Sequence, residues 1–242
     1  MELRPLGSSG LLVSPICLGT MTFGTPVPEA DAIRLVHESI DMGINFIDTA
    51  NGYNAGLSEE IIGRGMKARG NRERIVLATK VRYAVGGDPD TAGSSPKVIL
   101  REVENSLRRL NTDYIDIYYL HQPDDDTPIE TTWRALESLV SSGKVRYIGV
   151  SNFAAWQVVE AVNLARNRGW TPPTVTQALH NAISRAVETE LLPMTRSYDI
   201  GTCMYNPLAG GLLTGKYKAG KEAGSDTRFA ANEMYRKRYW ND

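Results

Sequence analysis

The stretch INFIDTANGYN, residues 44–54, joins a short apolar run to a polar loop. The run at residues 44–47 is typical of a buried strand, and Asp48 and Tyr53 follow it closely. Asp, Asn and Gly are common in turns, so an ordinary strand end would explain this stretch on its own. Whether the two polar side chains have a functional meaning depends on how the other strands of the chain end.

Six further apolar, β-branched runs begin near residues 17, 75, 115, 145, 174 and 201. With the run near residue 45 included, neighbouring runs are about 27 to 40 residues apart, close to the length of one strand–helix crossover unit. Amphipathic helical patterns fill the intervals, as at residues 33–40, 99–110 and 133–140, where apolar residues recur every three or four positions. Strands that alternate with helices predict a parallel sheet.

Two architectures have such a sheet: a doubly wound open sheet and a closed (β/α)₈ barrel. An open dinucleotide-binding sheet would carry G-x-G-x-x-G after its first strand, and residues 18–24 (LGTMTFG) do not match that pattern. The barrel is therefore favoured, although it needs eight strands and the sequence has seven strand-like runs. Before the first run, residues 3–6 and 11–13 flank a Gly-Ser-Ser-Gly turn, which predicts a β-hairpin.

The composition is that of an ordinary soluble globular protein. Of the 242 residues, 42% are hydrophobic and 23% charged, and the net charge is −1, so neither nucleic acid nor a membrane is an expected partner. Cys17 and Cys203 lie in apolar segments and are predicted to be free thiols rather than a disulfide. No linker divides the chain, and no apolar segment resembles a signal peptide. We expect one domain over residues 1–242 and a cytoplasmic location.

Polar groups stand at the ends of three neighbouring strands. Asp48 and Tyr53 follow the second strand, Lys80 ends the third and His121 ends the fourth. In a barrel the carboxyl ends of the strands meet at one face, so these four side chains are expected to converge. A single Lys or His at a strand end has many structural explanations. The combination of all four on neighbouring strands favours a functional site.

This set of groups is suited to delivering a proton to a carbonyl oxygen. A phenol has a pKa near ~10 and is a poor acid at neutral pH, but a neighbouring ammonium lowers that pKa. A carboxylate would hold the lysine in place, and a histidine could orient the substrate oxygen. The sequence offers no nucleophile motif, metal-ligand cluster or phosphate cradle beside these residues. Hydride transfer from a nicotinamide, with Tyr53 as proton donor, fits the set.

Several motifs together resemble the aldo-keto reductase family in order and spacing: DTANGYN with SEEIIGRGMK, ATK, YYLHQPD, GKVRYIGVSNF and NPLAGGLLTGKY. The resemblance covers essentially the whole chain. It implies a (β/α)₈ TIM barrel and NADPH-dependent reduction of an aldehyde or ketone to an alcohol. It assigns the catalytic roles to Asp48, Tyr53, Lys80 and His121.

The resemblance also implies which residues hold NADPH (NADP⁺). Asp48, Ser151, Asn152 and Gln177 would lie at the nicotinamide, with Tyr205 stacked on its ring. A glycine-containing loop would surround the pyrophosphate. The full cofactor set is Thr20, Met21, Asp48, Ser151, Asn152, Gln177, Tyr205, Pro207, Leu208, Gly210, Leu212, Lys216 and Arg228.

Residues 216–242 are polar and contain no strand-like run. The family comparison therefore implies that the eighth strand and the segment after it are absent from this sequence, and we expect residues beyond Asp242. The run at residues 231–240 is predicted to begin a helix.

Two other functions stay open: a cofactor-binding regulatory subunit, since potassium-channel β-subunits share the fold, and an inactive truncated form. The identity of the carbonyl substrate and the oligomeric state are not predicted.

Overall fold

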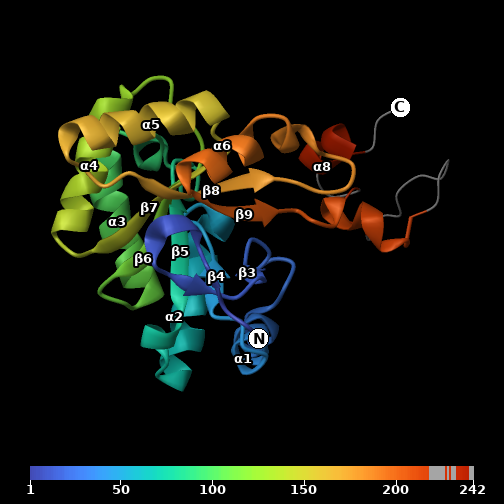
Figure 1. Cartoon of the computed structure of the whole chain (residues 1–242). Helices are drawn as coiled ribbons and strands as arrows, with labels where there is room; N and C mark the ends of the chain where they lie inside the picture. Colours follow the sequence, from blue (N-terminus) through green and yellow to red (C-terminus); the bar gives the residue numbers. More distant parts are fainter. Residues whose placement is uncertain (218–226, 228, 230–232, 240–242) are drawn as a thin grey trace.

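A computed structural model describes residues 1–217, 227, 229 and 233–239. Its centre is a seven-stranded parallel sheet in which each strand pairs with the next strand along the chain (Figure 1). The strands are β3 (Cys17–Gly19), β4 (Phe46–Asp48), β5 (Val76–Val81), β6 (Ile115–Leu120), β7 (Val145–Ser151), β8 (Pro173–Leu179) and β9 (Gly201–Tyr205). All seven predicted strands are confirmed.

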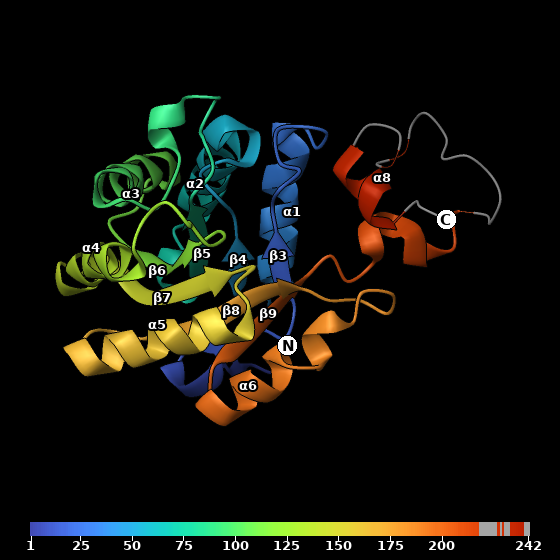
Figure 2. The ribbon, with the colours of Figure 1, turned by 90° about the horizontal axis from the view of Figure 1, so that it is seen from above.

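The sheet curves into a nearly closed barrel, with β3 and β9 as its two edges in the described part of the chain. Viewed from above, the helices lie around its outer face (Figure 2). They are α1 (Glu29–Asp41), α2 (Leu57–Arg69), α3 (Pro96–Leu110), α4 (Ile129–Ser141), α5 (Ala155–Arg168) and α6 (Leu191–Tyr198). This α/β arrangement is that of the predicted (β/α)₈ fold. None of the described helices is long and apolar enough to cross a membrane.

The sequence explains where the helices begin and end. In α3 the Ser95 hydroxyl accepts a hydrogen bond from the Val98 amide, Pro96 occupies the first turn, and Asn111 ends the helix in the left-handed conformation. Its apolar stripe, Ile99 included, faces the sheet and is buried. The predicted helical patterns at residues 33–40 and 133–140 correspond to α1 and α4. A core of apolar side chains fills the layer between the helices and the barrel.

The predicted hairpin consists of β1 (Arg4–Pro5) and β2 (Leu12–Val13), which pair antiparallel. Leu6 and Val13 are buried against Phe46 and Val76, the first residues of β4 and β5. The hairpin therefore covers the amino-terminal end of the barrel. The carboxyl ends of the strands, where barrel enzymes carry their sites, lie at the opposite end.

The run predicted to start a helix forms α8 (Glu233–Tyr239). Tyr235 and Tyr239 of α8 are buried against Ala209, which lies in the kinked 3₁₀ segment η6 (Ala209–Thr214) after β9. The predicted free thiols are also confirmed, since Cys17 and Cys203 form no disulfide.

Candidate active site

Asp48, Tyr53 and Lys80 converge at the carboxyl end of the barrel. The Lys80 side chain is fully buried, and its ammonium donates three hydrogen bonds. The distances from Nζ are 2.5 Å to Asp48 Oδ1, 2.7 Å to the Thr49 carbonyl and 3.2 Å to the Tyr53 hydroxyl. The three donor hydrogens of the ammonium are thereby all directed at the last residue of β4 and the segment that follows it.

Local backbone contacts bring Tyr53 to Lys80. The Asn51 amide donates to the Lys80 carbonyl at 3.1 Å, and the Tyr53 amide donates to the Ala50 carbonyl at 3.1 Å. After Tyr53 the chain turns sharply, with φ of 48° at Asn54 and 55° at Ala55. Such left-handed conformations are costly for residues with a Cβ and suggest a turn that the surroundings hold in shape.

Burial and neighbouring charges shift the pKa values of Tyr53 and Lys80 in opposite directions. Burial raises the pKa of the Tyr53 phenol, Lys80 lowers it, and the net direction is upward. The expectation that Lys80 acts on the phenol is correct in sign, but burial outweighs it. Burial by itself would lower the pKa of Lys80, yet the Asp48 carboxylate and Tyr53 raise that pKa above its ordinary value. At neutral pH the site therefore holds a protonated phenol next to a charged ammonium.

His121 directly follows β6, and its amide donates to the Val81 carbonyl at 2.9 Å. Its ring packs edge-on against Tyr53 and Tyr83, at centroid distances of 5.6 and 4.7 Å. Burial, assisted by the charge of Lys80, holds the pKa of His121 well below its usual range. Its Nδ1 is buried and has no hydrogen-bond partner among the described residues. The ring is therefore a neutral imidazole.

A cavity of about 1090 Å³ opens above these groups. The ends of β4, β6, β7, β8 and β9 contribute predicted residues to its wall. The lining includes the catalytic candidates Asp48, Tyr53 and His121, while Lys80 lies behind them without reaching the cavity. Most of the predicted cofactor residues also line it: Thr20, Met21, Asp48, Ser151, Asn152, Gln177, Tyr205, Pro207, Leu208, Gly210 and Lys216.

Two predicted cofactor residues are not placed in this wall. Leu212 packs instead against the apolar cluster behind this wall, which contains Phe229 and Tyr235. The reason is local: Gly210 and Gly211 have positive φ, and the turn that they form directs Leu212 to that cluster. Arg228 lies outside the described residues.

The side chains on the floor of the cavity are held by one another. Asn152 Nδ2 donates to the His121 carbonyl at 2.9 Å, and Asn152 Oδ1 accepts from the Tyr205 hydroxyl at 2.8 Å. Gln177 Nε2 donates to Asp48 Oδ2 at 3.1 Å. The residues predicted for the nicotinamide are thus connected to the catalytic candidates by direct hydrogen bonds.

The structure adds lining residues that the sequence did not assign. Met234, Tyr235 and Arg238 come from α8. Tyr83 and the loop at residues 122–127 were expected at the pocket, and Tyr83 and Gln122 do line it, with the Tyr83 hydroxyl donating to Gln122 Oε1 at 2.5 Å. The alternation of apolar and charged residues in α8 predicts a helix but not its packing partner. Asn206 also belongs here, because its Oδ1 accepts from the Gly210 amide at 2.7 Å and so shapes the loop.

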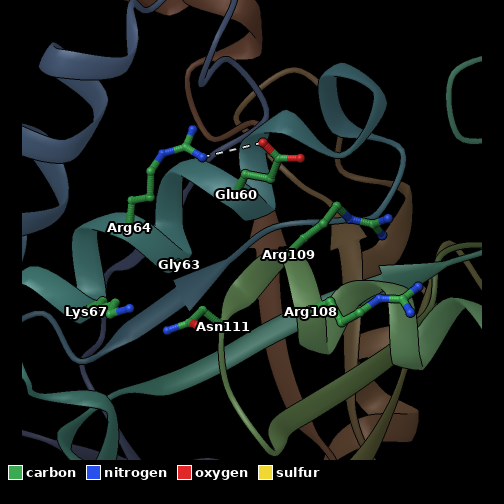
Figure 3. Close-up of a pocket in the computed structure, with 7 residues that line it drawn as sticks. All are labelled: Glu60, Gly63, Arg64, Lys67, Arg108, Arg109 and Asn111. Atoms are coloured by element: carbon green, nitrogen blue, oxygen red, sulfur yellow. Dashed lines mark hydrogen bonds and ion pairs between the residues drawn. The ribbon is translucent and has the colours of Figure 1, made fainter.

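A smaller cavity, of about 370 Å³, lies between α2 and α3 (Figure 3). Its basic side chains do not converge: Arg64 reaches toward Glu60, and Arg108 and Arg109 extend away from Lys67. A Cβ on Gly63 would lie 2.6 Å from the Arg109 carbonyl, so this crevice marks a close crossing of two helices. The described residues contain no group of three or more His, Cys, Asp or Glu side chains that could hold a metal ion.

Comparison with known proteins gives one consistent result. The model of the Aldo/keto reductase family matches residues 15–239. An uncharacterized oxidoreductase of Bacillus subtilis, YrpG, is 45% identical over 89% of this chain and 69% of its own length. Human aldo-keto reductase family 7 member A3 is 40% identical over 93% of this chain and 68% of its own length. A probable voltage-gated potassium channel subunit beta of rice (Oryza sativa subsp. japonica) is 39% identical over 95% of this chain and 70% of its own length. The chain thus spans about two thirds of the length of these relatives.

Proposed function

The chain belongs to the aldo/keto reductase family, and on that premise we propose that it reduces an aldehyde or ketone to the alcohol with NADPH as cofactor. The observation that carries the proposal is the fully buried Lys80 ammonium, which contacts both Asp48 and the Tyr53 hydroxyl at the floor of a large cavity. A buried charge of this kind is costly unless it is paired, and here the ammonium is paired with Asp48 and adjoins the Tyr53 hydroxyl.

In the proposed reaction Tyr53 donates its proton to the carbonyl oxygen. A nicotinamide held in the cavity would supply the hydride to the carbonyl carbon. The carbon–hydrogen bond of that donor, the Tyr53 oxygen–hydrogen bond and the π bond of the carbonyl break, and one carbon–hydrogen and one oxygen–hydrogen bond form in the alcohol. The Tyr53 phenolate that remains is stabilised by the Lys80 ammonium at 3.2 Å and regains a proton from solvent. Asp48 keeps Lys80 charged and oriented. The neutral His121 ring offers a hydrogen bond that orients the carbonyl oxygen.

The cavity wall is suited to a nicotinamide cofactor. Ser151, Asn152 and Gln177 present the hydroxyl and amide groups that a carboxamide can bind, beside Asp48. Tyr205 supplies an aromatic face, and it is fixed by its bond to Asn152. The loop after β9 has positive φ at Ala209, Gly210 and Gly211, and glycine there allows a phosphate to approach the backbone closely. Lys216 adds a positive charge to the same wall.

A second candidate is a cofactor-binding subunit without turnover. Its support is the similarity to the rice protein named as a potassium channel subunit. A catalytic function is favoured by His121, which completes a set of four acid–base side chains: Asp48, Tyr53 and His121 line the cavity, and Lys80 lies directly behind them. A cytoplasmic location and a single domain over residues 1–242 remain predictions.

Titration of the purified protein with NADPH, followed by cofactor fluorescence, tests the binding half of the proposal. Turnover of a nitrobenzaldehyde tests the catalytic half, with absorbance of NADPH as the readout. Binding with turnover is the expected result. Binding without turnover would favour the subunit function, and absence of binding would contradict both.

A further inference from the structure

Outside the cavity, a buried ionic cluster joins α2 and α3. Glu59 of α2 and Glu102 of α3 are fully buried, and Arg109 of α3 lies between them. Arg109 Nε donates to Glu59 Oε2 at 2.6 Å, whereas Arg109 Nη2 is 3.9 Å from Glu102 Oε2. Buried carboxylates are costly, and well-packed apolar side chains could join two helices equally well. Helix packing alone therefore does not account for the buried carboxylates of Glu59 and Glu102.

Glu59 is explained by the packing of the two helices and the barrel. Besides Arg109, it accepts a hydrogen bond of 2.5 Å from the Thr79 hydroxyl of β5. Glu102 differs, because one of its oxygens faces the loop that carries Tyr53. Asn51 Nδ2 donates to Glu102 Oε2 at 3.2 Å, and Asn105 of the same helix donates to Oε1 at 2.8 Å. Glu102 thus connects α3 to the catalytic loop.

Asn51 is the residue through which Glu102 is connected to the loop that carries Tyr53. It is fully buried, and its backbone amide donates to the Lys80 carbonyl at 3.1 Å. Its side chain reaches outward to Glu102, so one residue links the third barrel strand to α3. Tyr53 follows two residues later, and its amide is bonded to the carbonyl of Ala50. A shift of Asn51 would therefore move Tyr53 relative to Lys80.

The turn after Tyr53 depends on support from its surroundings. Asn54 and Ala55 both have positive φ, which is unfavourable for residues other than glycine. Arg109 supports this side of the loop: a Cβ on Gly56 would lie 2.8 Å from Arg109 Cδ. The loop is therefore held on one side by the Arg109 stem and on the other by the Glu102–Asn51 hydrogen bond.

We propose that Glu102 is a positioning residue for Tyr53 and acts through its hydrogen bond to Asn51. The proposal rests on the function proposed above, in which Tyr53 is the proton donor. Glu102 touches neither substrate nor cofactor. Its role is to keep the Tyr53 hydroxyl at hydrogen-bond distance from Lys80.

A double-mutant cycle with Glu102→Ala and Asn51→Ala tests this role. Displacement of a reacting group by about 1 Å can cost about 10²-fold in rate, so each single variant should lower kcat by roughly 10- to 100-fold. NADPH affinity should stay within about twofold, since neither side chain lines the cavity. Because both substitutions break the same bond, the double variant should be no slower than the slower single variant.

Two further variants separate positioning from general packing. Glu102→Gln has one oxygen that can accept from Asn51 and loses only the acceptor for Asn105, so it should retain most of the wild-type kcat. Glu104→Ala is the matched control on the same helix, where the side chain is half-exposed and paired with Lys144, and it should leave kcat unchanged. Losses that multiply in the double variant, or a normal kcat in a folded Asn51→Ala variant, would overturn the proposal. The Asn51→Ala result stands even if Glu102→Ala does not fold.

A readout independent of turnover separates this proposal from the proposed function. The ionisation of Tyr53 is measured as the difference in tyrosinate absorbance between each variant and the same variant with Tyr53→Phe added. If Asn51→Ala loosens the contact with Lys80, Tyr53 ionises at higher pH than in the wild type, because the ammonium favours the phenolate. An unmoved titration overturns the positioning role. A shifted titration in a protein that shows no turnover supports it, while the reductase function fails.

Discussion

Replacement of Lys80 by methionine removes one charge from the proposed site and keeps a side chain of similar length. In the wild type the ammonium is 3.2 Å from the Tyr53 hydroxyl and is fully buried. With an effective dielectric constant of about 20, a charge pair at this distance interacts by roughly 5 kcal/mol, which is an upper limit because Asp48 offsets part of the field. Opposite charges at such distances commonly move a pKa by about 1 to 3 units.

The sign of the effect follows from the two opposing influences on Tyr53. Burial raises the pKa of Tyr53 and Lys80 lowers it, so Lys80→Met should raise that pKa further. Tyr53 stays protonated at neutral pH in both proteins, but it becomes a weaker acid and carbonyl reduction slows. For the reverse oxidation Tyr53 must first lose its proton, so the alkaline rise of the oxidation rate should move to higher pH by about 1 to 3 units.

The assay is the pH–rate profile of alcohol oxidation with NADP⁺, compared between the wild type and Lys80→Met. Because Lys80→Met leaves the Asp48 carboxylate buried without its partner, it should also destabilise the protein by about 3–5 kcal/mol. The variant Asp48→Asn/Lys80→Met removes that unpaired charge and serves as the control for folding. An unmoved alkaline limb with ordinary rates in a folded variant would refute the role of Lys80 in tuning Tyr53.

Two other expectations concern packing and pH. A Cβ on Gly149 would lie 2.5 Å from the Tyr119 ring, so Gly149→Ala should lower the free energy of unfolding by about 1–3 kcal/mol. An unchanged midpoint of urea unfolding would contradict this contact. The pKa of His121 lies well below its usual range, so His121 stays neutral as the pH falls through about 6.5. The rate of carbonyl reduction should therefore show no transition near that pH. A transition centred there in the wild type, and absent in His121→Ala, would contradict a neutral His121.

The sequence predicted the strands and the convergence of the catalytic candidates because both depend on local patterns. Apolar runs with polar ends fix where Asp48 and Lys80 stand on the strands, and parallel pairing then brings the ends together. The direction of the Tyr53 pKa could not be predicted, because it depends on how deeply the phenol is buried. The contact between Asn51 and Glu102 joins residues that are 51 positions apart, and no local pattern indicates it.

In the loop after β9, too, local sequence patterns predict some features and not others. Gly210 and Lys216, predicted from the sequence as cofactor residues, line the cavity, but the orientation of Leu212 follows from backbone angles that the sequence pattern does not specify. Met234 and Arg238 reach the cavity because α8 packs on η6. Their helix was predicted, whereas its docking position is a tertiary property.

The turnover number of Tyr53→Phe with NADPH and a nitrobenzaldehyde tests the assignment of the proton donor. This variant removes one oxygen and leaves the ring that packs against His121. We expect kcat to fall by about 10² to 10⁴-fold, the usual contribution of a general acid, with the Kd for NADPH nearly unchanged. A Tyr53→Phe protein that reduces the aldehyde at close to the wild-type rate would show that the proton comes from another group.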